Sequence, residues 1–542
     1  MNYIPLKEIV SSLQNVSEPI VEAQSSKKIE VSKKTLVLIS FGFLSLALSL
    51  GIALGVTIQN KNHELKSHEN LANFIQTLPQ VQFELLNSAI LHNNSEILES
   101  LLKKQPKDET IAKDLVNQAF FLAVELDNLG MVQTLITSGA NVSAKNELFE
   151  TPIHLASSSK MIKLLTDHGS DPNDQDHKGE SALHKNIDVK TVTELISNNA
   201  NVNAKSKNNV TALMSSAFYG KPEVVNVLLH NGANINDMDY RSRTPLHYAC
   251  TGNSSEKDKT YVAQILLYAG AKVNAMDFKN ETALHYSSHN GDLEMANMLI
   301  YFGADPNARN NKLETPLHLA KTPKMATFLL QHGAKIEAKN NYNDTKLCDA
   351  SWHGDLEMAK VLLRYEAAPN ALCYHNETAL QLVTNEHDIT NNTELVELLL
   401  KHEAKVDVTN QQSMTPLHFA SSYGNIGEVQ VLIKYGANVN ATGESLITPL
   451  HMAALGHIGD GLANVTEILL KNGANIEAKD DNLRTPLHYA VENMYGLDVA
   501  KVLVQHGADL KAKSKDGKTP LEVATEEKNV DVVEFLKGFN KH

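Results

Sequence analysis

The sequence predicts an all-α solenoid of paired antiparallel helices with protruding loops, preceded by a single transmembrane helix. Two observations support this prediction. A Thr-Pro-Leu-His tetrapeptide, or a near copy of it, recurs along the chain at intervals of 30 to 38 residues, and self-similarity at such a period indicates a repeat architecture. Residues 35–58 form an apolar run without a single charge, and a run of this length is typical of a membrane-spanning helix.

The N-terminal part of the chain precedes the repeats. Residues 1–34 are rich in Ser, Glu and Lys, which predicts a disordered tail. As a helix, residues 35–58 would be about 36 Å long, enough to cross a hydrocarbon core of about 30 Å. A secretory signal peptide fits less well, because its apolar region is usually only about 7–15 residues long. Apolar residues at helical spacing then predict a short helical stalk over residues 59–82.

The orientation of this predicted single-pass membrane protein remains open. Four lysines precede the apolar run and two follow it closely (Lys27, Lys28, Lys33, Lys34; Lys61, Lys66). The positive-inside rule therefore favours a cytoplasmic N-terminus and a C-terminal body on the far side. Within the run, Gly51 and Gly55 share one helix face, which would permit close approach of two helices in a homodimer. Alternatively, Gly51 and Gly55 only reflect the general abundance of glycine in membrane helices.

The repeats extend over residues 83–542, with about fourteen units expected. In Thr244-Pro245-Leu246-His247, threonine suits the N-cap and proline the first helical position. A second apolar stretch follows and ends at Gly270, a residue that readily takes the left-handed conformation closing a helix. Two less regular units, 83–105 and 117–146, precede the twelve tagged ones, which begin at Thr151, Ser181, Thr211, Thr244, Thr282, Thr315, Thr345, Thr378, Thr415, Thr448, Thr485 and Thr519.

This pattern resembles the ankyrin repeat over about 85% of the chain. The resemblance implies units of helix, turn, helix and protruding loop that bind partner proteins on a concave face of loop tips and first helices. Three longer spacings predict extra surface loops at 252–259, 385–393 and 455–463. At the glycine position, Glu366 and Glu403 are expected to adopt a left-handed conformation at a cost of about 1 kcal/mol each.

Histidine is abundant, yet the sequence predicts no metal site. Eight histidines occupy the last position of the tag and would lie about 10 Å apart along a helix stack, which is too far to share one ion. The resemblance implies instead that they form hydrogen bonds between neighbouring repeats. They are His154, His184, His247, His285, His318, His418, His451 and His488.

Composition and motifs exclude several classes of function. No phosphate-binding glycine loop, nucleophile elbow or zinc-protease motif occurs in the sequence, so neither an enzyme nor a cofactor is expected. A net charge of −14 argues against binding nucleic acid, which depends on cationic side chains. Three cysteines leave at least one unpaired, and their scarcity favours a reducing compartment. Cys250 and Cys348 are expected to be buried core thiols.

Partner-binding residues are inferred from the positions that the resemblance places on the first helices and loop tips. Aromatic residues and arginine, which often anchor interfaces, are concentrated there. Alternatively, these rings fill gaps between loops. The candidates are Phe218, Tyr219, Trp352, His353 and Tyr423 after the first helices, and Tyr240, Arg241, Arg243, Phe278, Tyr342 and Tyr374 at the loop tips.

The leading hypothesis is a membrane-tethered scaffold for protein partners whose identity is unknown. Two alternatives remain open: a structural membrane protein that self-associates through Gly51 and Gly55, and a regulator of a catalytic partner. The Lys-, Asn- and Ile-rich composition is typical of an AT-rich genome, and a bacterium that lives inside host cells would be one such source.

Overall fold

The computed structural model describes residues 79–103, 109–385, 392–456 and 461–539. The predicted tail (1–34), the predicted membrane helix (35–58) with Gly51 and Gly55, and the stalk up to residue 78 lie outside these ranges. All regular elements of the described residues are helices. Within these ranges, none of the helices combines the length and the apolar character that crossing a bilayer requires.

The chain divides into two compact bodies. The smaller body comprises the described residues up to Ala123 together with Gly130–Ala140, and the larger comprises Val124–Leu129 and the described residues from Asn141 onward. The smaller body is built mainly from α4 (Pro79–Leu91), α5 (Ser95–Leu102), α6 (Glu109–Glu125) and α7 (Leu129–Thr137). Helix α4 begins at Pro79, four residues before the expected start of the repeats, and its Ile90 is buried.

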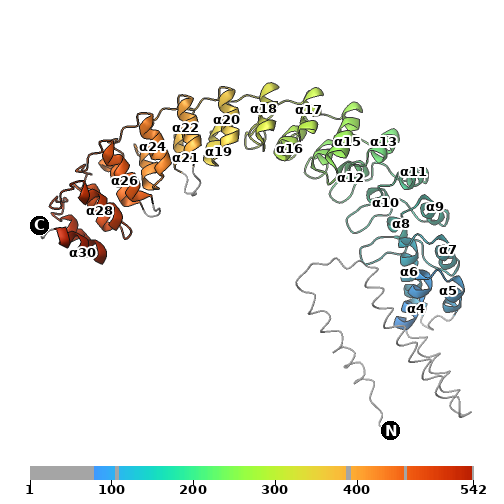
Figure 1. The fold of residues 1–542 in the computed structure, drawn as a ribbon. Helices are drawn as coiled ribbons and strands as arrows, with labels where there is room; N and C mark the ends of the chain where they lie inside the picture. The colour runs from blue at the N-terminus through green and yellow to red at the C-terminus, as the bar shows by residue number, and fades with distance from the viewer. Residues whose placement is uncertain (1–78, 104–108, 386–391, 457–460, 540–542) are drawn as a thin grey trace, which may run out of the picture. The chain divides into compact units, whose positions relative to one another are not determined.

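The larger body is a succession of helix–turn–helix repeats (Figure 1). Together with the two helix pairs of the smaller body, the described residues contain fourteen repeats, of which the one at Thr315 has turns in place of its first helix. The helices are α8 (Pro152–Leu155), α9 (Ser159–Asp167), α10 (Ala182–Lys185), α11 (Val189–Ser197), α12 (Ala212–Phe218), α13 (Pro222–His230), α14 (Pro245–Thr251), α15 (Glu256–Tyr268), α16 (Ala283–Asn290), α17 (Leu293–Tyr301), α18 (Pro323–Gln331), α19 (Lys346–Trp352), α20 (Leu356–Arg364), α21 (Ala379–Thr384), α22 (Thr393–Lys401), α23 (Pro416–Ser422), α24 (Ile426–Lys434), α25 (Pro449–Leu455), α26 (Leu462–Lys471), α27 (Pro486–Glu492), α28 (Leu497–Gln505), α29 (Pro520–Glu526) and α30 (Val530–Phe539).

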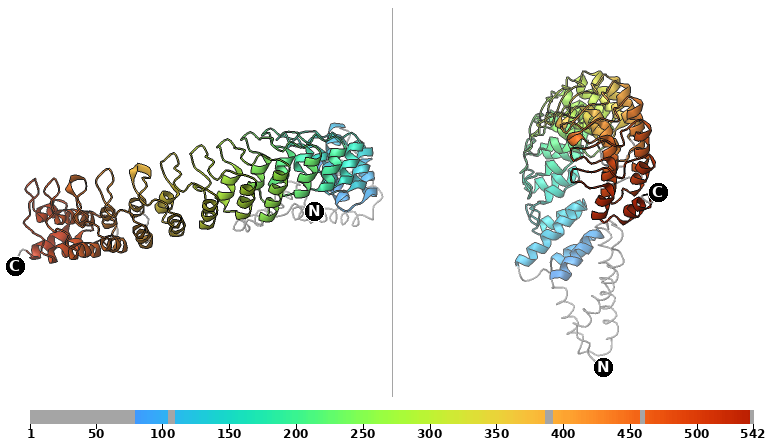
Figure 2. Two further views of the ribbon diagram at one scale, coloured as in Figure 1. Left: turned by 90° about the horizontal axis from the view of Figure 1, so that it is seen from above. Right: turned by 90° about the vertical axis from the view of Figure 1, so that its left-hand side faces the viewer.

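Each repeat buries its apolar face against its neighbours. In the repeat that begins at Thr244, Leu246 and Ala249 of α14 and Val262 and Leu266 of α15 are buried. Helix α14 contacts the first helices on either side, α12 and α16, while α15 contacts the second helices α13 and α17. The core of the larger body is therefore shared between repeats, and its connecting loops project together to one side of the helices (Figure 2).

Turn geometry follows the expectation at the ends of the second helices. Gly270 has φ +96°, in the left-handed region that favours glycine. Glu366 and Glu403 occupy the equivalent positions with φ 66° and 67°. The predicted left-handed conformation of these two glutamates is thus confirmed.

The length of a repeat determines the length of its first helix. The three repeats of 30 residues begin at Thr151, Ser181 and Thr315. Helices α8 and α10 have only four residues, and turns replace the first helix over 316–319. The fully described first helices of the longer repeats have seven or eight residues in most cases, as in α14 and α16.

The predicted surface loop at 252–259 is partly wrong. Ser255 caps helix α15, whose first residue is Glu256, so the extra residues lengthen the second helix to 13 residues. Of the two other predicted insertions, residues 386–391 and 457–460 lie outside the described ranges.

Candidate functional site

The tag histidines connect successive repeats within the larger body. In His247, Nδ1 accepts the N–H of Thr244 at 3.1 Å, and Nε2 lies 3.1 Å from the carbonyl oxygen of Glu281 in the next repeat. Because Nδ1 accepts a backbone N–H, the ring proton must reside on Nε2, which donates to the carbonyl. The same arrangement occurs for His154, His184, His285, His318, His418, His451 and His488.

Burial favours the neutral form of these histidines, which the hydrogen bonds require. Desolvation lowers the pKa of all eight imidazoles, and that of His418 to about 4. In the neutral form, both ring nitrogens take part in the hydrogen bonds described above, one as acceptor and one as donor. The prediction that the tag histidines tie neighbouring repeats together is confirmed.

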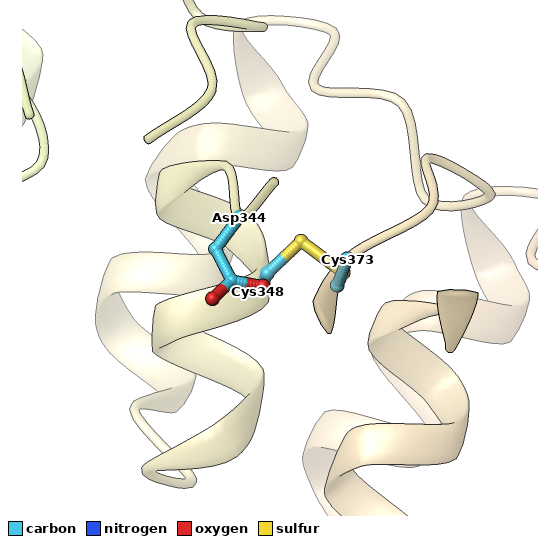
Figure 3. Close-up of side chains that lie close together, drawn as sticks. All are labelled: Asp344, Cys348 and Cys373. Atoms are coloured by element: carbon cyan, nitrogen blue, oxygen red, sulfur yellow. A yellow bond between two sulfur atoms is a disulfide. The ribbon is translucent and has the colours of Figure 1, made fainter. Parts of the chain in front are cut away.

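One repeat replaces the imidazole with a covalent link. Cys348 occupies the tag position of the repeat that begins at Thr345, and it forms a disulfide with Cys373 in the following loop (Figure 3). This corrects the expectation that Cys348 is an unpaired core thiol. The disulfide also argues against the reducing compartment that the scarcity of cysteine favoured, because disulfides persist mainly in oxidising compartments. Cys250 is the remaining free thiol; it is buried, and burial raises its pKa.

A carboxylate lies beside this disulfide. One oxygen of Asp344 and the two sulfur atoms are within 4.8 Å of one another. Figure 3 shows the three side chains close together. Since both sulfurs are joined in the disulfide, the group offers no thiolate ligands in this state. Asp344 Oδ1 instead accepts the backbone N–H of Tyr374 at 2.7 Å.

Three of the predicted site residues meet at one pocket of about 480 Å³. Tyr342 lies in the loop before α19, Trp352 is the last residue of α19, and Tyr374 lies in the loop before α21. About half of each side chain is exposed (53%, 49% and 48%). The rings of Tyr342 and Tyr374 meet edge to face with centroids 5.9 Å apart. The other lining residues are Glu314, His318, Asn340, Asp344, Cys348, Asp349, His375, Glu377, Leu382 and Asn385.

The pocket is acidic as well as aromatic. Burial raises the pKa of Asp344 and of Glu377. Asp349 is paired with Lys346 at 2.8 Å. These carboxylates were not among the predicted site residues, because each lies in a different loop or helix and they come together only in the folded chain. A signal was nevertheless present, since Asp344 and Glu377 both directly precede a tag threonine.

A second group of predicted residues lies two to four repeats earlier. The Arg241 guanidinium is 5.1 Å from the centroid of the Tyr240 ring and 5.6 Å from that of Phe278. All three side chains are exposed. This loop-tip cluster is available for contact with a partner.

The remaining predicted residues are engaged within the protein or lie apart. Arg243 donates to Asp239 and to the Tyr248 hydroxyl, both at 2.9 Å, so its guanidinium serves a local network. Phe218 is half-buried and packs edge-on against Tyr248, next to the exposed Tyr219.

His353 and Tyr423 do not line the pocket at Trp352. The exposed His353 has its Nδ1 2.8 Å from the carbonyl oxygen of Asp349. Tyr423 is half-buried, and burial raises its pKa.

A further aromatic patch, which the sequence analysis did not identify, lies on the second helices. Tyr268 at the end of α15 and Tyr301 at the end of α17 are 69% and 78% exposed, and both rings contact Phe302 edge to face. Helix α15 also borders a shallow recess of about 600 Å³ lined by Tyr261 and Tyr268. This patch, formed by Tyr268, Tyr301 and Phe302, is therefore a second exposed aromatic surface.

Comparison with known proteins places the chain in a family. The family model described as "Ankyrin repeats (3 copies)" matches in overlapping segments from residue 120 to residue 542. An ankyrin repeat protein of Fowlpox virus (strain NVSL) is 30% identical over 132 residues, covering 23% of this chain and 19% of the relative. The B-cell lymphoma 3 protein homolog of Mus musculus is 30% identical over 148 residues, covering 24% and 33%.

Other matches are similarly partial. A protein of Dictyostelium discoideum named as a serine/threonine-protein kinase is 31% identical over 189 residues, which cover 32% of this chain and 19% of that protein. The solved structure of the ankyrin repeat domain of Bcl-3 is 29% identical and covers 39% of this chain and 97% of the solved one, with a TM-score of 0.34. The curated matches thus span a third or less of the relatives' own lengths. Since the family model matches most of the sequence, this chain belongs to the ankyrin-repeat family.

Proposed function

We propose that this protein is a membrane-tethered scaffold that binds partner proteins on the face formed by its first helices and loop tips. The observation that carries the proposal is the pocket where Tyr342, Trp352 and Tyr374 converge. Half-exposed aromatic rings around a concave pocket have the composition of an interface anchor. The repeats supply a rigid support for this anchor, since each shares its core with its neighbours.

Loss of the anchor tests the proposal. Partners cross-linked to the full chain in its native cells are identified by mass spectrometry and compared with those of the Tyr342→Ala/Trp352→Ala variant. We expect the double variant to lose its main partner while keeping its helical circular dichroism. The matched control is Tyr268→Ala/Tyr301→Ala, which removes two aromatic rings from the second-helix patch. If the control loses the partner and the pocket variant keeps it, the second-helix patch is the binding surface and the proposal is wrong.

The tether is assigned to residues 35–58, on the basis of the sequence alone. Their uncharged run is long enough to span a bilayer. The lysine bias before the run favours the non-cytoplasmic side for the repeats under the positive-inside rule, and the disulfide between Cys348 and Cys373 supports the same orientation. A bacterial source is an additional hypothesis that rests on composition only.

Two alternative functions lead to different experiments. A self-associating membrane protein would dimerise through Gly51 and Gly55, so Gly51→Leu/Gly55→Leu would reduce its size in detergent. A regulator of a catalytic partner would use the same pocket and alter that partner's activity. We propose no catalytic activity for the chain itself, because its tag histidines are committed to hydrogen bonds between repeats.

A further inference from the structure

Four consecutive repeats carry a carboxylate directly before the tag threonine. These residues, the carboxylate row, are Glu281, Glu314, Asp344 and Glu377. All six repeats from Thr211 onward that lie outside the row have an apolar or basic residue at this position, namely Val210, Arg243, Met414, Ile447, Arg484 and Lys518. Glu150 and Glu180 precede the two earliest tags, at Thr151 and Ser181, so the row is the longer of two acidic stretches at this position.

The hydrogen bonds between repeats place these residues side by side. The carbonyl oxygen of Glu314 accepts from His285, the histidine of the tag that Glu281 precedes. In the same way, the carbonyl oxygen of Asp344 accepts from His318 of the preceding repeat. Glu281, Glu314 and Asp344 are thus linked in succession through one imidazole each, whereas between Asp344 and Glu377 the tag residue is Cys348, joined by the disulfide to Cys373.

Several of these carboxylates are partly desolvated. Burial raises the pKa of Glu281, Asp344 and Glu377. Among the described residues, no ion pair within 4.0 Å forms to Glu314, Asp344 or Glu377; the neighbouring lysine, Lys346, is paired with Asp349 instead. A desolvated carboxylate is stabilised by an approaching cation, because the opposite charge compensates for lost hydration.

An earlier repeat pairs the equivalent carboxylate with a lysine of the protein itself. Glu150 occupies the same position before Thr151, and Lys185 lies 2.6 Å from Glu150 and 2.8 Å from Asp176. There the protein supplies its own cation. At Glu314, Asp344 and Glu377 that cation is left for a partner to provide.

Aromatic rings share a pocket with three carboxylates of the row. Tyr342, Trp352 and Tyr374 line one pocket with Glu314, Asp344 and Glu377. The face of an aromatic ring attracts a cation through its quadrupole, and tryptophan does so most strongly. Carboxylates add charge-assisted hydrogen bonds to a guanidinium or ammonium group. The volume of about 480 Å³ accommodates a long side chain with its flanking backbone.

We infer that this pocket receives an arginine or lysine side chain of a basic segment in the partner protein, and that the carboxylate row binds the residues that flank it. This inference rests on the proposed function and names the partner's chemistry. Glu314 and Asp344 accept hydrogen bonds from Asn310 and Tyr374, but these donors are neutral. Charge complementarity selects the occupant, because an acidic or neutral segment would leave the carboxylates without a compensating positive charge.

The lone tryptophan of the chain supplies a direct probe, since Trp352 is the only one among 542 residues. The full chain, purified in a mild non-ionic detergent, is titrated with a capped peptide that carries three arginines between glycine and serine residues. We expect a saturable change in tryptophan fluorescence. The matched peptide with glutamine in place of arginine should produce none.

Charge variants separate the pocket from the general negative charge of the chain. Glu314→Gln/Glu377→Gln should weaken binding about tenfold or more, whereas Glu357→Gln, which alters an exposed glutamate of α20, should leave it unchanged. Tyr342→Ala should also weaken binding while retaining the fluorescent probe. Calorimetry on the same samples provides an affinity that does not depend on fluorescence.

Several results would overturn the inference. Equal weakening by Glu357→Gln would assign binding to diffuse charge attraction, and equal binding of the glutamine peptide would remove the need for a cation. A chain without residues 1–34 that bound the arginine peptide tenfold more tightly would assign the pocket to the chain's own lysine-rich segment. If cross-linking still detected a partner at Trp352 while these peptide tests failed, the proposed function would stand and the basic chemistry alone would be wrong.

Discussion

At the scale of single residues, the tag histidine combines two functions. Its Nδ1 completes the capping box of its own helix, and its Nε2 holds the next repeat, as in His451 with Thr448 and Arg484. Gln381 shows which part of the imidazole matters: its Oε1 accepts from the N–H of Thr378 and its Nε2 donates to the carbonyl of Val408. An acceptor and a donor in fixed orientation are sufficient, so protonation of the acceptor nitrogen should break the cap.

Acid should therefore destabilise the larger body. Burial lowers the pKa of His418 from 6.5 to about 4, so between these pH values the unfolded chain binds more protons than the folded chain. The stabilisation is complete above about pH 6.5 and is lost as the pH falls, by up to about 2 kcal/mol for this residue near pH 5. Urea unfolding midpoints at pH 7.5 and pH 5 measure the effect.

The matched variant for this prediction is His418→Gln, which copies the natural arrangement at Gln381. Its midpoint should change less between the two pH values than that of the native chain. An unchanged pH dependence in this variant would show that other groups cause the acid sensitivity.

The left-handed glutamates allow a second prediction at the residue scale. Glu366 has φ 66°, where a side chain costs about 1 kcal/mol relative to glycine. Glu366→Gly should raise the melting temperature recorded by circular dichroism. Gly333→Ala, a change in the opposite direction at φ +88°, should lower it. A lower melting temperature for Glu366→Gly would mean that contacts of the glutamate side chain outweigh the backbone strain.

At the scale of elements, periodicity predicted the helix pairs well and the pocket poorly. The tag marks a capped helix start in most repeats, so α14, α23 and α27 directly follow Thr244, Thr415 and Thr485; the exception is Thr315, after which turns take the place of the first helix. The disulfide could not be predicted in this way. Cys348 and Cys373 are 25 residues apart in sequence. They meet because the loop that carries Cys373, before α21, folds back against α19, which carries Cys348.

The pocket escaped prediction for a related reason. Its aromatic rings were among the candidates, but its carboxylates come from three consecutive repeats and share no local motif. Only stacking brings them together. Arg241 and Arg243 likewise looked equivalent in sequence, and both were predicted to bind a partner. In the structure, Arg243 is paired with the buried carboxylate of Asp239.

The disulfide between α19 and the next loop should stabilise this part of the larger body. It closes a loop of 25 residues, for which about 2–4 kcal/mol is typical. Cys373→Ser should lower the urea unfolding midpoint, and a thiol reductant should do the same to the native chain. The reductant should have no further effect on Cys373→Ser. If it lowered the midpoint of both proteins equally, its action would not involve this disulfide.

At the scale of the whole molecule, the proposed tether makes a prediction that is independent of the repeats. The full chain should sediment with membranes and resist extraction by alkaline carbonate, since a run of 24 apolar or neutral residues (35–58) partitions into the bilayer. A chain that lacks residues 35–58 should appear in the supernatant with unchanged helical circular dichroism. Carbonate extraction of the full chain would contradict the tether.

The central claim is that partners contact the pocket at Trp352, and site-specific photo-crosslinking tests it most directly. A photoreactive phenylalanine analogue replaces Tyr342 or Tyr374 at the pocket, or Tyr301 on the second-helix patch, which is the more exposed position at 78%. Irradiation of cells should produce a cross-linked partner from positions 342 and 374 and none from 301. Products from position 301 alone would contradict the account and place the binding surface on the second helices.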